Sequence, residues 1–178
     1  MKTSSQPPPK ARNRPRRPFG RSPFFWVGVG GGLGLIKPAP GTWGSLLGLP
    51  LAYFLSRYPI DVTALTWHDA VGPLWWFWML SVAWASCGPT CRELGRKDPG
   101  EFVADEYVAF AGVYLFVPFT TWTAVVGFGL FRLFDIWKPW PVRWLDRRGG
   151  TSGVMLDDLA AAGLVVVSLL LFQRGGQL

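Results

Sequence analysis

Acidic residues are concentrated in one part of this 178-residue chain, since nine of its eleven Asp and Glu fall between Glu93 and Asp158. Two carboxylate pairs, Asp105-Glu106 and Asp157-Asp158, each adjoin an uncharged segment. Carboxylate oxygens are the ligands that Mg²⁺ prefers. One pair alone is equally well explained as the start of a helix, where acids complement the dipole or cap the first turn. Two such pairs predict a shared metal site, with two unrelated caps as the alternative.

Basic residues follow an apolar run at Arg132 and Lys138, with Asp135 between them. Their i, i+3, i+6 spacing predicts one face of a helix that ends before Pro139. Arg binds phosphate through paired hydrogen bonds and Lys through its point charge, so we expect both to bind phosphoryl oxygens. Asp135 would ligate the metal or orient the two bases. The alternative is a ladder of helix ion pairs, each worth about a few tenths of a kcal/mol.

A third motif, Pro40-Gly41-Thr42-Trp43-Gly44-Ser45, places hydroxyls and backbone N–H groups at an expected helix start. Such a start can bind a phosphate, so Thr42 and Ser45 are candidate substrate-binding residues; a simple turn with an N-cap is the alternative. The glycine-rich stretch 28–34 matches neither G-x-G-x-x-G nor a P-loop, so a nucleotide site is not supported. Asp98 and Asp146 are weaker candidates for catalytic or metal-binding residues.

If the chain hydrolyses a phosphate ester, the sequence lacks the residues that several known phosphatase chemistries need. Cys87 and Cys91 each precede an arginine by C-x4-R, one residue short of the C-x5-R loop of cysteine phosphatases. His68 is the only histidine, which also argues against a zinc site, and an i, i+4 disulfide would be strained, so we expect free thiols. With these chemistries excluded, metal-assisted hydrolysis by carboxylates is the one that the residues support. The candidate metal ligands are Asp105, Glu106, Asp157 and Asp158, and the candidate catalytic residues are Asp105, Glu106, Asp135 and Asp158.

Four uncharged segments, 38–56, 70–91, 107–131 and 159–173, must position these residues. A membrane span needs about 20 apolar residues, so the middle two are long enough, whereas the first contains three prolines and the last is short. Pro118 predicts one kinked helix or two shorter ones, and Gly44-x-x-x-Gly48 predicts a close helix contact. We expect an all-α, membrane-embedded multi-helix bundle with re-entrant or short apolar helices. A soluble helical domain with an apolar surface is the alternative.

The net charge of +7 belongs to the N-terminal part of the chain. Eight basic and no acidic residues precede Pro38, whereas the remainder has ten basic and eleven acidic residues, a net charge of −1. We expect residues 1–22 to be a disordered basic tail and 23–174 to be one helical domain. We expect the tail to bind anionic lipid head groups or to act as a cytoplasmic topology signal; a solvated extension with no specific role is the alternative. Nucleic-acid binding is not expected, because the body offers no matching basic face.

These motifs together resemble the phosphatidylglycerophosphatase A family. The resemblance covers about residues 28–165 and rests on four segments in the family's order: 37–45, the pair at 105–106, 131–146 and 149–158. It implies a bacterial inner-membrane enzyme that uses Mg²⁺ to hydrolyse phosphatidylglycerophosphate to phosphatidylglycerol and inorganic phosphate, and it says nothing about the tail. From the apolar segments and the basic N-terminal part we expect a multi-pass protein with its tail on the cytoplasmic side. Ala109 and Thr151 depart from glycines that are usual in the family, and both changes are small.

Two other functions remain open from the sequence. One is a non-enzymatic membrane protein that binds anionic lipid, with its charges serving as structural ion pairs. The other is a phosphatase that acts on a different lipid phosphate. Clustering of the acids with Arg132 and Lys138 argues against the first. Whether the two acidic pairs converge in space decides between a shared site and separate caps, because Mg²⁺ bonds are about 2 Å long.

Overall fold

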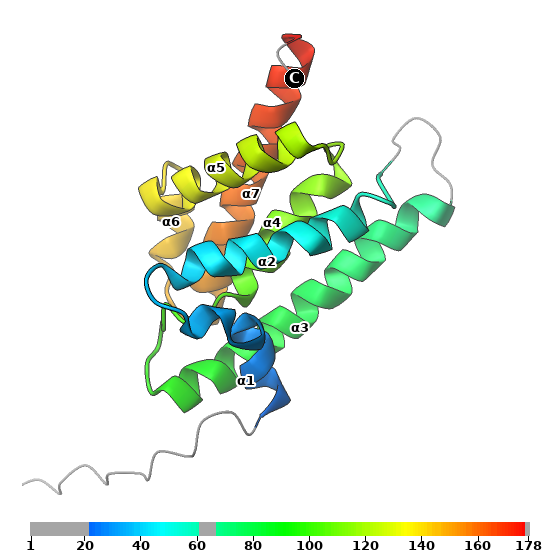
Figure 1. The fold of residues 1–178 in the computed structure, drawn as a ribbon. Helices are drawn as coiled ribbons and strands as arrows, with labels where there is room; N and C mark the ends of the chain where they lie inside the picture. Colours follow the sequence, from blue (N-terminus) through cyan, green and yellow to red (C-terminus); the bar gives the residue numbers. More distant parts are fainter. Residues whose placement is uncertain (1–21, 61–66, 177–178) are drawn as a thin grey trace, which may run out of the picture.

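A computed structural model describes residues 22–60 and 67–176, and in those residues all regular structure is helical, which confirms the all-α prediction (Figure 1). The elements are α1 (Pro23–Gly28), η1 (Gly30–Leu35), α2 (Pro40–Leu55), η2 (Trp67–Ala70), α3 (Val71–Leu94), α4 (Ala104–Gly112), η3 (Val113–Leu115), α5 (Thr121–Trp137), α6 (Val142–Asp146) and α7 (Gly150–Arg174). The predicted basic tail lies outside the described residues, apart from Ser22.

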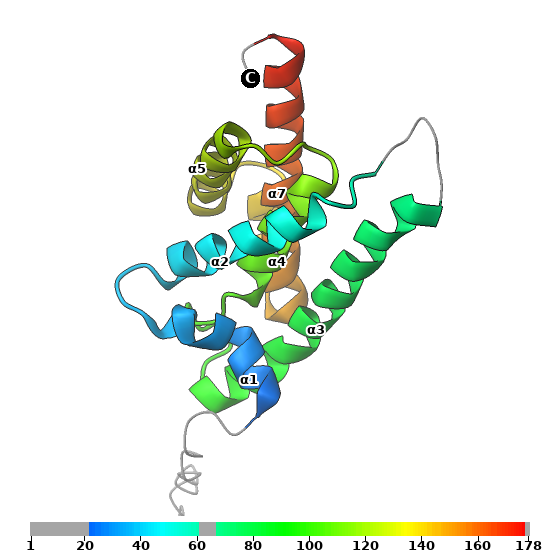
Figure 2. The same ribbon diagram turned by 45° about the vertical axis from the view of Figure 1, so that its right-hand side comes forward.

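Helix α4 is the centre of the bundle. It packs against α2, α3 and α7, and Figures 1 and 2 show it enclosed by these longer helices. All but one of its nine residues are buried, as expected for a helix that is apolar on every side. Its first turn is charged, not apolar, because it contains the buried Asp105 and the half-buried Glu106. The central helix of the fold therefore begins with the first acidic pair.

Glycines let α2 approach α4 closely. A Cβ atom at Gly44 would lie 2.5 Å from the Cβ of Val103, and one at Gly48 would lie 2.8 Å from Cδ1 of Phe110. Neither space admits a larger side chain without a shift of α4, so the predicted contact through Gly44-x-x-x-Gly48 is confirmed. This approach brings the N-terminal turns of α2 against the first turn of α4.

The segment 107–131 is divided at Pro118 into separate helices, one of the two predicted alternatives. Thr120 then caps α5: its Oγ1 accepts the Thr123 N–H at 3.1 Å, and its own N–H donates to Thr123 Oγ1 at 2.9 Å. The chain reverses at this break, and α5 packs across α7 (Figures 1 and 2). The reversal returns the C-terminal end of α5 to the start of α4.

Among the described residues, α7 is the one helix that is long and apolar enough to cross a membrane: it has 25 residues, and an 18-residue window within it has a mean hydropathy of 2.2. It contains the uncharged segment 159–173, which alone is short for a membrane span. The helix itself is longer, because it begins at Gly150. The two segments expected to be long enough do not qualify: α3 carries four tryptophans and a polar C-terminal end, and 107–131 is divided. Embedding by several helices therefore stays a prediction.

Candidate active site

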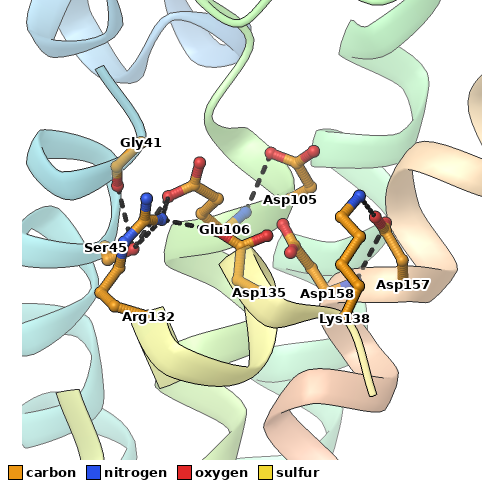
Figure 3. A network of polar contacts seen from close by, with 9 residues as sticks. All are labelled: Gly41, Ser45, Asp105, Glu106, Arg132, Asp135, Lys138, Asp157 and Asp158. Atoms are coloured by element: carbon orange, nitrogen blue, oxygen red, sulfur yellow. Dashed lines mark hydrogen bonds and ion pairs between the residues drawn. The ribbon is translucent and has the colours of Figure 1, made fainter. Parts of the chain in front are cut away.

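Both acidic pairs converge with the basic end of α5 at one place in the bundle (Figure 3). The pair on α4 stands in its first turn, and the pair on α7 stands two turns into that helix, not at its start as the sequence suggested. The N-terminal turns of α2 complete the site. The residues brought together are Ser45, Asp105, Glu106, Arg132, Asp135, Lys138, Asp157 and Asp158. Two unrelated helix caps do not describe this arrangement, because Asp157 and Asp158 cap nothing.

Arg132 organises one side of the site. Its Nη1 donates to Glu106 Oε2 and to Asp135 Oδ2, both at 2.8 Å, so the predicted i, i+3 pair is present. The Ser45 hydroxyl, fully buried on α2, lies 2.8 Å from the same Glu106 oxygen and 2.9 Å from the carbonyl oxygen of Gly41. Nε of Arg132 is buried and has no partner among the described residues. The guanidinium therefore keeps donor capacity for a further acceptor.

Lys138 lies at the opposite side of the site. Its spacing predicted a place on the helix face of Arg132 and Asp135, and that prediction was wrong. Lys138 is the C-cap of α5 with a left-handed backbone (φ 48°), and its side chain contacts α6 and α7. Its Nζ donates to Asp157 Oδ2 at 2.8 Å and to a carboxylate oxygen of Asp146. Burial alone would lower the pKa of Lys138, but these two carboxylates outweigh it and raise that pKa. Asp146 thus belongs to the site as the partner of Lys138.

Asp105 and Asp158 lie between these two ion-paired groups, and both are buried. Asp105 Oδ1 accepts the backbone N–H of Glu106 at 2.9 Å, but within the described chain no Lys or Arg pairs with either Asp105 or Asp158. Burial, and then the negative charges of Glu106, Asp157 and Asp135, raise the pKa of Asp105 well above its ordinary value. The site contains six carboxylates and two bases, so with all of them ionised it carries a net charge of −4. That excess of acids is compensated either by bound protons, as the raised pKa of Asp105 indicates, or by a cation.

The donor set fits a hard divalent cation, because every candidate ligand is a carboxylate. In the described ranges, however, no three His, Cys, Asp or Glu side chains stand as a ready-made metal site. Glu106 and Asp157, which we expected to be ligands, form ion pairs with Arg132 and Lys138 in this arrangement, so their role as ligands stays a prediction. Asp105 and Asp158 are the carboxylates left for a metal, and a complete set of ligands requires side-chain adjustment.

Three further residues are placed by the structure. Thr42 is half-buried, and its hydroxyl makes no hydrogen bond among the described residues, so it remains a candidate for substrate binding. Asp98 is exposed and does not belong to the cluster. Gly41 is a residue whose role the sequence did not reveal: a Cβ atom there would lie 2.2 Å from Glu106 Oε1. Its position between Pro40 and Thr42 in the α2 motif was the available signal.

Comparison with known proteins identifies the family. The sequence model described as phosphatidylglycerophosphatase A matches residues 26–173. The chain belongs to the phosphatidylglycerophosphatase A family. That match runs from α1 to the end of α7, so it includes every element that contributes to the site. Membership makes the chain a phosphatase, and it confirms the resemblance seen in the motifs.

Three relatives illustrate the range of names in the family. Phosphatidylglycerophosphatase A of Escherichia coli (strain K12) is 34% identical over 85% of this chain and 83% of its own length. The Haemophilus influenzae protein of the same name is 35% identical over 85% of this chain and 90% of its own. A Bacteroides thetaiotaomicron protein, provisionally named phosphatidylinositol-3-phosphatase, is 34% identical over 76% of this chain and 84% of its own length. No solved structure matches the chain significantly.

Proposed function

We propose that this chain hydrolyses phosphatidylglycerophosphate to phosphatidylglycerol and inorganic phosphate. The observation that carries the proposal is the convergence of a buried carboxylate cluster with Arg132 and Lys138 in a chain of this family. Carboxylates that hold a metal and bases that hold phosphoryl oxygens are the two components of metal-assisted phosphoryl transfer. A non-enzymatic lipid-binding protein has no need to bury uncompensated carboxylates, because their desolvation is costly.

Mg²⁺ is the proposed cofactor, held by Asp105 and Asp158 with Asp135 beside them. When bound, it supplies Lewis-acid polarisation of a phosphoryl oxygen and a coordinated water of lowered pKa. Support comes from the chemistry of the donors and from the excess of negative charge in the site. Asp157 remains a candidate ligand that becomes available when a phosphate competes for Lys138. For Glu106, a role as metal ligand is the alternative to a role as proton donor.

Arg132 and Lys138 are proposed to bind the phosphate group. Both already hold carboxylate oxygens at hydrogen-bonding distance, and a phosphate presents the same kind of acceptor with more charge. The unpartnered Nε of Arg132 adds a donor. In hydrolysis a water oxygen forms a new bond to phosphorus and loses a proton, while the bond between phosphorus and the glycerol oxygen breaks and that oxygen takes up a proton. Glu106, whose pKa burial raises to about 7, is the candidate to supply it.

The membrane arrangement is also a proposal. Helix α7 would cross the bilayer of a bacterial inner membrane, with the other apolar helices embedded beside it and the basic N-terminal tail on the cytoplasmic side. Its length and apolar composition support a crossing, and the exposed tryptophans of α3 support burial of that helix in lipid. The two lipid tails of the substrate would then remain in the bilayer while its phosphate enters the site.

A panel of lipid phosphates tests this function. Purified chain is mixed separately with phosphatidylglycerophosphate, phosphatidic acid and phosphatidylinositol-3-phosphate, and phosphate release is measured with Asp105→Asn and Asp158→Asn as controls. We expect phosphatidylglycerophosphate to be hydrolysed fastest and both variants to lose activity. Preference for phosphatidylinositol-3-phosphate, which the name of the Bacteroides relative makes the second candidate, would reassign the substrate. Release that both variants retain would exclude the proposed site.

A further inference from the structure

The segment that supplies Arg132, Asp135 and Lys138 to the site presents a second, outward surface. Its large apolar side chains are strongly exposed: Ile136 at 73%, Trp137 at 64%, Trp140 at 83% and Trp144 at 54%. Exposing so much aromatic area to water is unfavourable, and in soluble proteins such patches mark binding surfaces. This outward side therefore requires a partner that covers it.

Three exposed arginines accompany these aromatic residues. Arg143, Arg147 and Arg148 stand in or just after α6, and none forms an ion pair within the described part of the chain. The nearby acid, Asp146, is already occupied by Lys138. The guanidinium of Arg148 lies over the ring of Trp144, 4.0 Å from its centroid. The surface thus carries three uncompensated positive charges among large aromatic rings.

This combination identifies the chemistry of the partner. Trp side chains prefer the boundary between hydrocarbon and water, and Arg side chains extend from apolar surroundings to reach charged head groups. Three positive charges select a negatively charged surface, since each basic residue near such a surface contributes to binding. A protein partner would satisfy the apolar residues but not explain three unpaired arginines. An anionic phospholipid bilayer satisfies both.

The location of this surface adds a functional consequence. Helix α6 packs against α7, the candidate membrane span, and it ends at Asp146, the partner of Lys138. We propose that Trp137, Trp140, Arg143, Trp144, Arg147 and Arg148, here named the aromatic–arginine surface, sit in the head-group region of an anionic bilayer. The site then opens at the depth of lipid phosphates. The supply of substrate by this route rests on the proposed function, whereas the membrane contact does not.

The contact is tested without any activity measurement. A spin label is attached at Trp140→Cys in the full chain, with Cys87 and Cys91 replaced by Ser, in nanodiscs of neutral phosphatidylcholine with or without phosphatidylglycerol. We expect phosphatidylglycerol to shield the label from a water-soluble nickel relaxant, and Arg143→Gln/Arg147→Gln/Arg148→Gln to remove that effect. A label at Trp122→Cys, an exposed tryptophan (59%) at the other end of α5, is the control and should not respond.

A second measurement addresses substrate supply. The triple Gln variant should hydrolyse phosphatidylglycerophosphate in an anionic bilayer at least about fivefold more slowly than the unmodified chain, because each lost charge weakens attraction to the surface. Its rate on a short-chain, monomeric analogue should be unchanged. A label at position 140 that is equally accessible in both nanodiscs, or equal losses on both substrates, overturns the proposal. If the unmodified chain cleaves neither substrate, the proposed function fails while the label result still decides the membrane contact.

Discussion

Gly41→Ala should disable the site through one added methyl group. The new Cβ would lie 2.2 Å from Glu106 Oε1, whereas ordinary contact begins near 3.4 Å, so the carboxylate must retreat by 3.4 − 2.2 = 1.2 Å. Glu106 Oε2 is held at 2.8 Å by both Ser45 and Arg132, and this retreat breaks those contacts. Misplacement of a catalytic group by about 1 Å costs on the order of 100-fold in rate.

The effect on stability should be smaller than the effect on activity. Hydrogen bonds to charged groups contribute about 1.5–3 kcal/mol each, but the Glu106 side chain is flexible and can find new partners. Alanine also favours the helix by up to about 1 kcal/mol relative to glycine. We therefore expect a net loss of about 1–2 kcal/mol in the free energy of unfolding, from terms of this size.

Phosphate release and thermal unfolding, measured on the same preparations, check this reasoning. Gly129→Ala is the matched control, because Gly129 lies on α5 three residues before Arg132 and a Cβ there meets nothing within 4 Å. Adding Glu106→Asp to Gly41→Ala shortens the carboxylate and should make the two losses less than additive. Wild-type turnover in Gly41→Ala would refute the idea that α2 positions Glu106.

Other consequences follow from the charges of the site. Asp158→Asn should lower turnover at least about 100-fold, yet leave the melting temperature in EDTA unchanged or higher, because it removes one buried charge from a cluster of like charges; a lower melting temperature would contradict the excess of negative charge. Lys138→Met should destabilise the fold by about 1–3 kcal/mol, because it leaves Asp157 buried without a cation, and Lys138→Arg should recover most of that loss. Burial raises the pKa of Glu106 from 4.5 to about 7. The folded chain therefore binds that proton more tightly than the unfolded chain, and metal-free stability should fall as pH rises across this interval. Melting temperatures measured in EDTA should therefore decrease as the pH rises over this interval. In Glu106→Gln that decrease should be smaller, because the titrating group has been removed.

Much of the site was predictable from the sequence because its charges are few and isolated in apolar surroundings. The two acidic pairs and the bases at the end of an apolar run marked the residues that the fold brings together. Gly44-x-x-x-Gly48 likewise indicated the contact between α2 and α4, since only small residues permit it. These features depend on residue type and local spacing, which the sequence states directly.

What the sequence could not supply were partners chosen by tertiary structure. Lys138 was placed on the face of Arg132 by helical periodicity, but its left-handed C-cap directs it to Asp146 and Asp157. The pair on α7 was placed at a helix start because it adjoins the uncharged segment 159–173, whereas the helix begins at Gly150. Both errors concern helix ends, where local propensity is weak and packing decides the boundary.

Phosphate release from phosphatidylglycerophosphate by the purified full chain, measured across a Mg²⁺ titration and in EDTA, is the most direct test of the central claim. We expect hydrolysis that requires the metal, is restored when Mg²⁺ is returned after chelation, and is lost in Asp105→Asn and Asp158→Asn. Hydrolysis that continues undiminished in EDTA would contradict the metal-assisted site. No release from this lipid under any condition would contradict the proposed substrate.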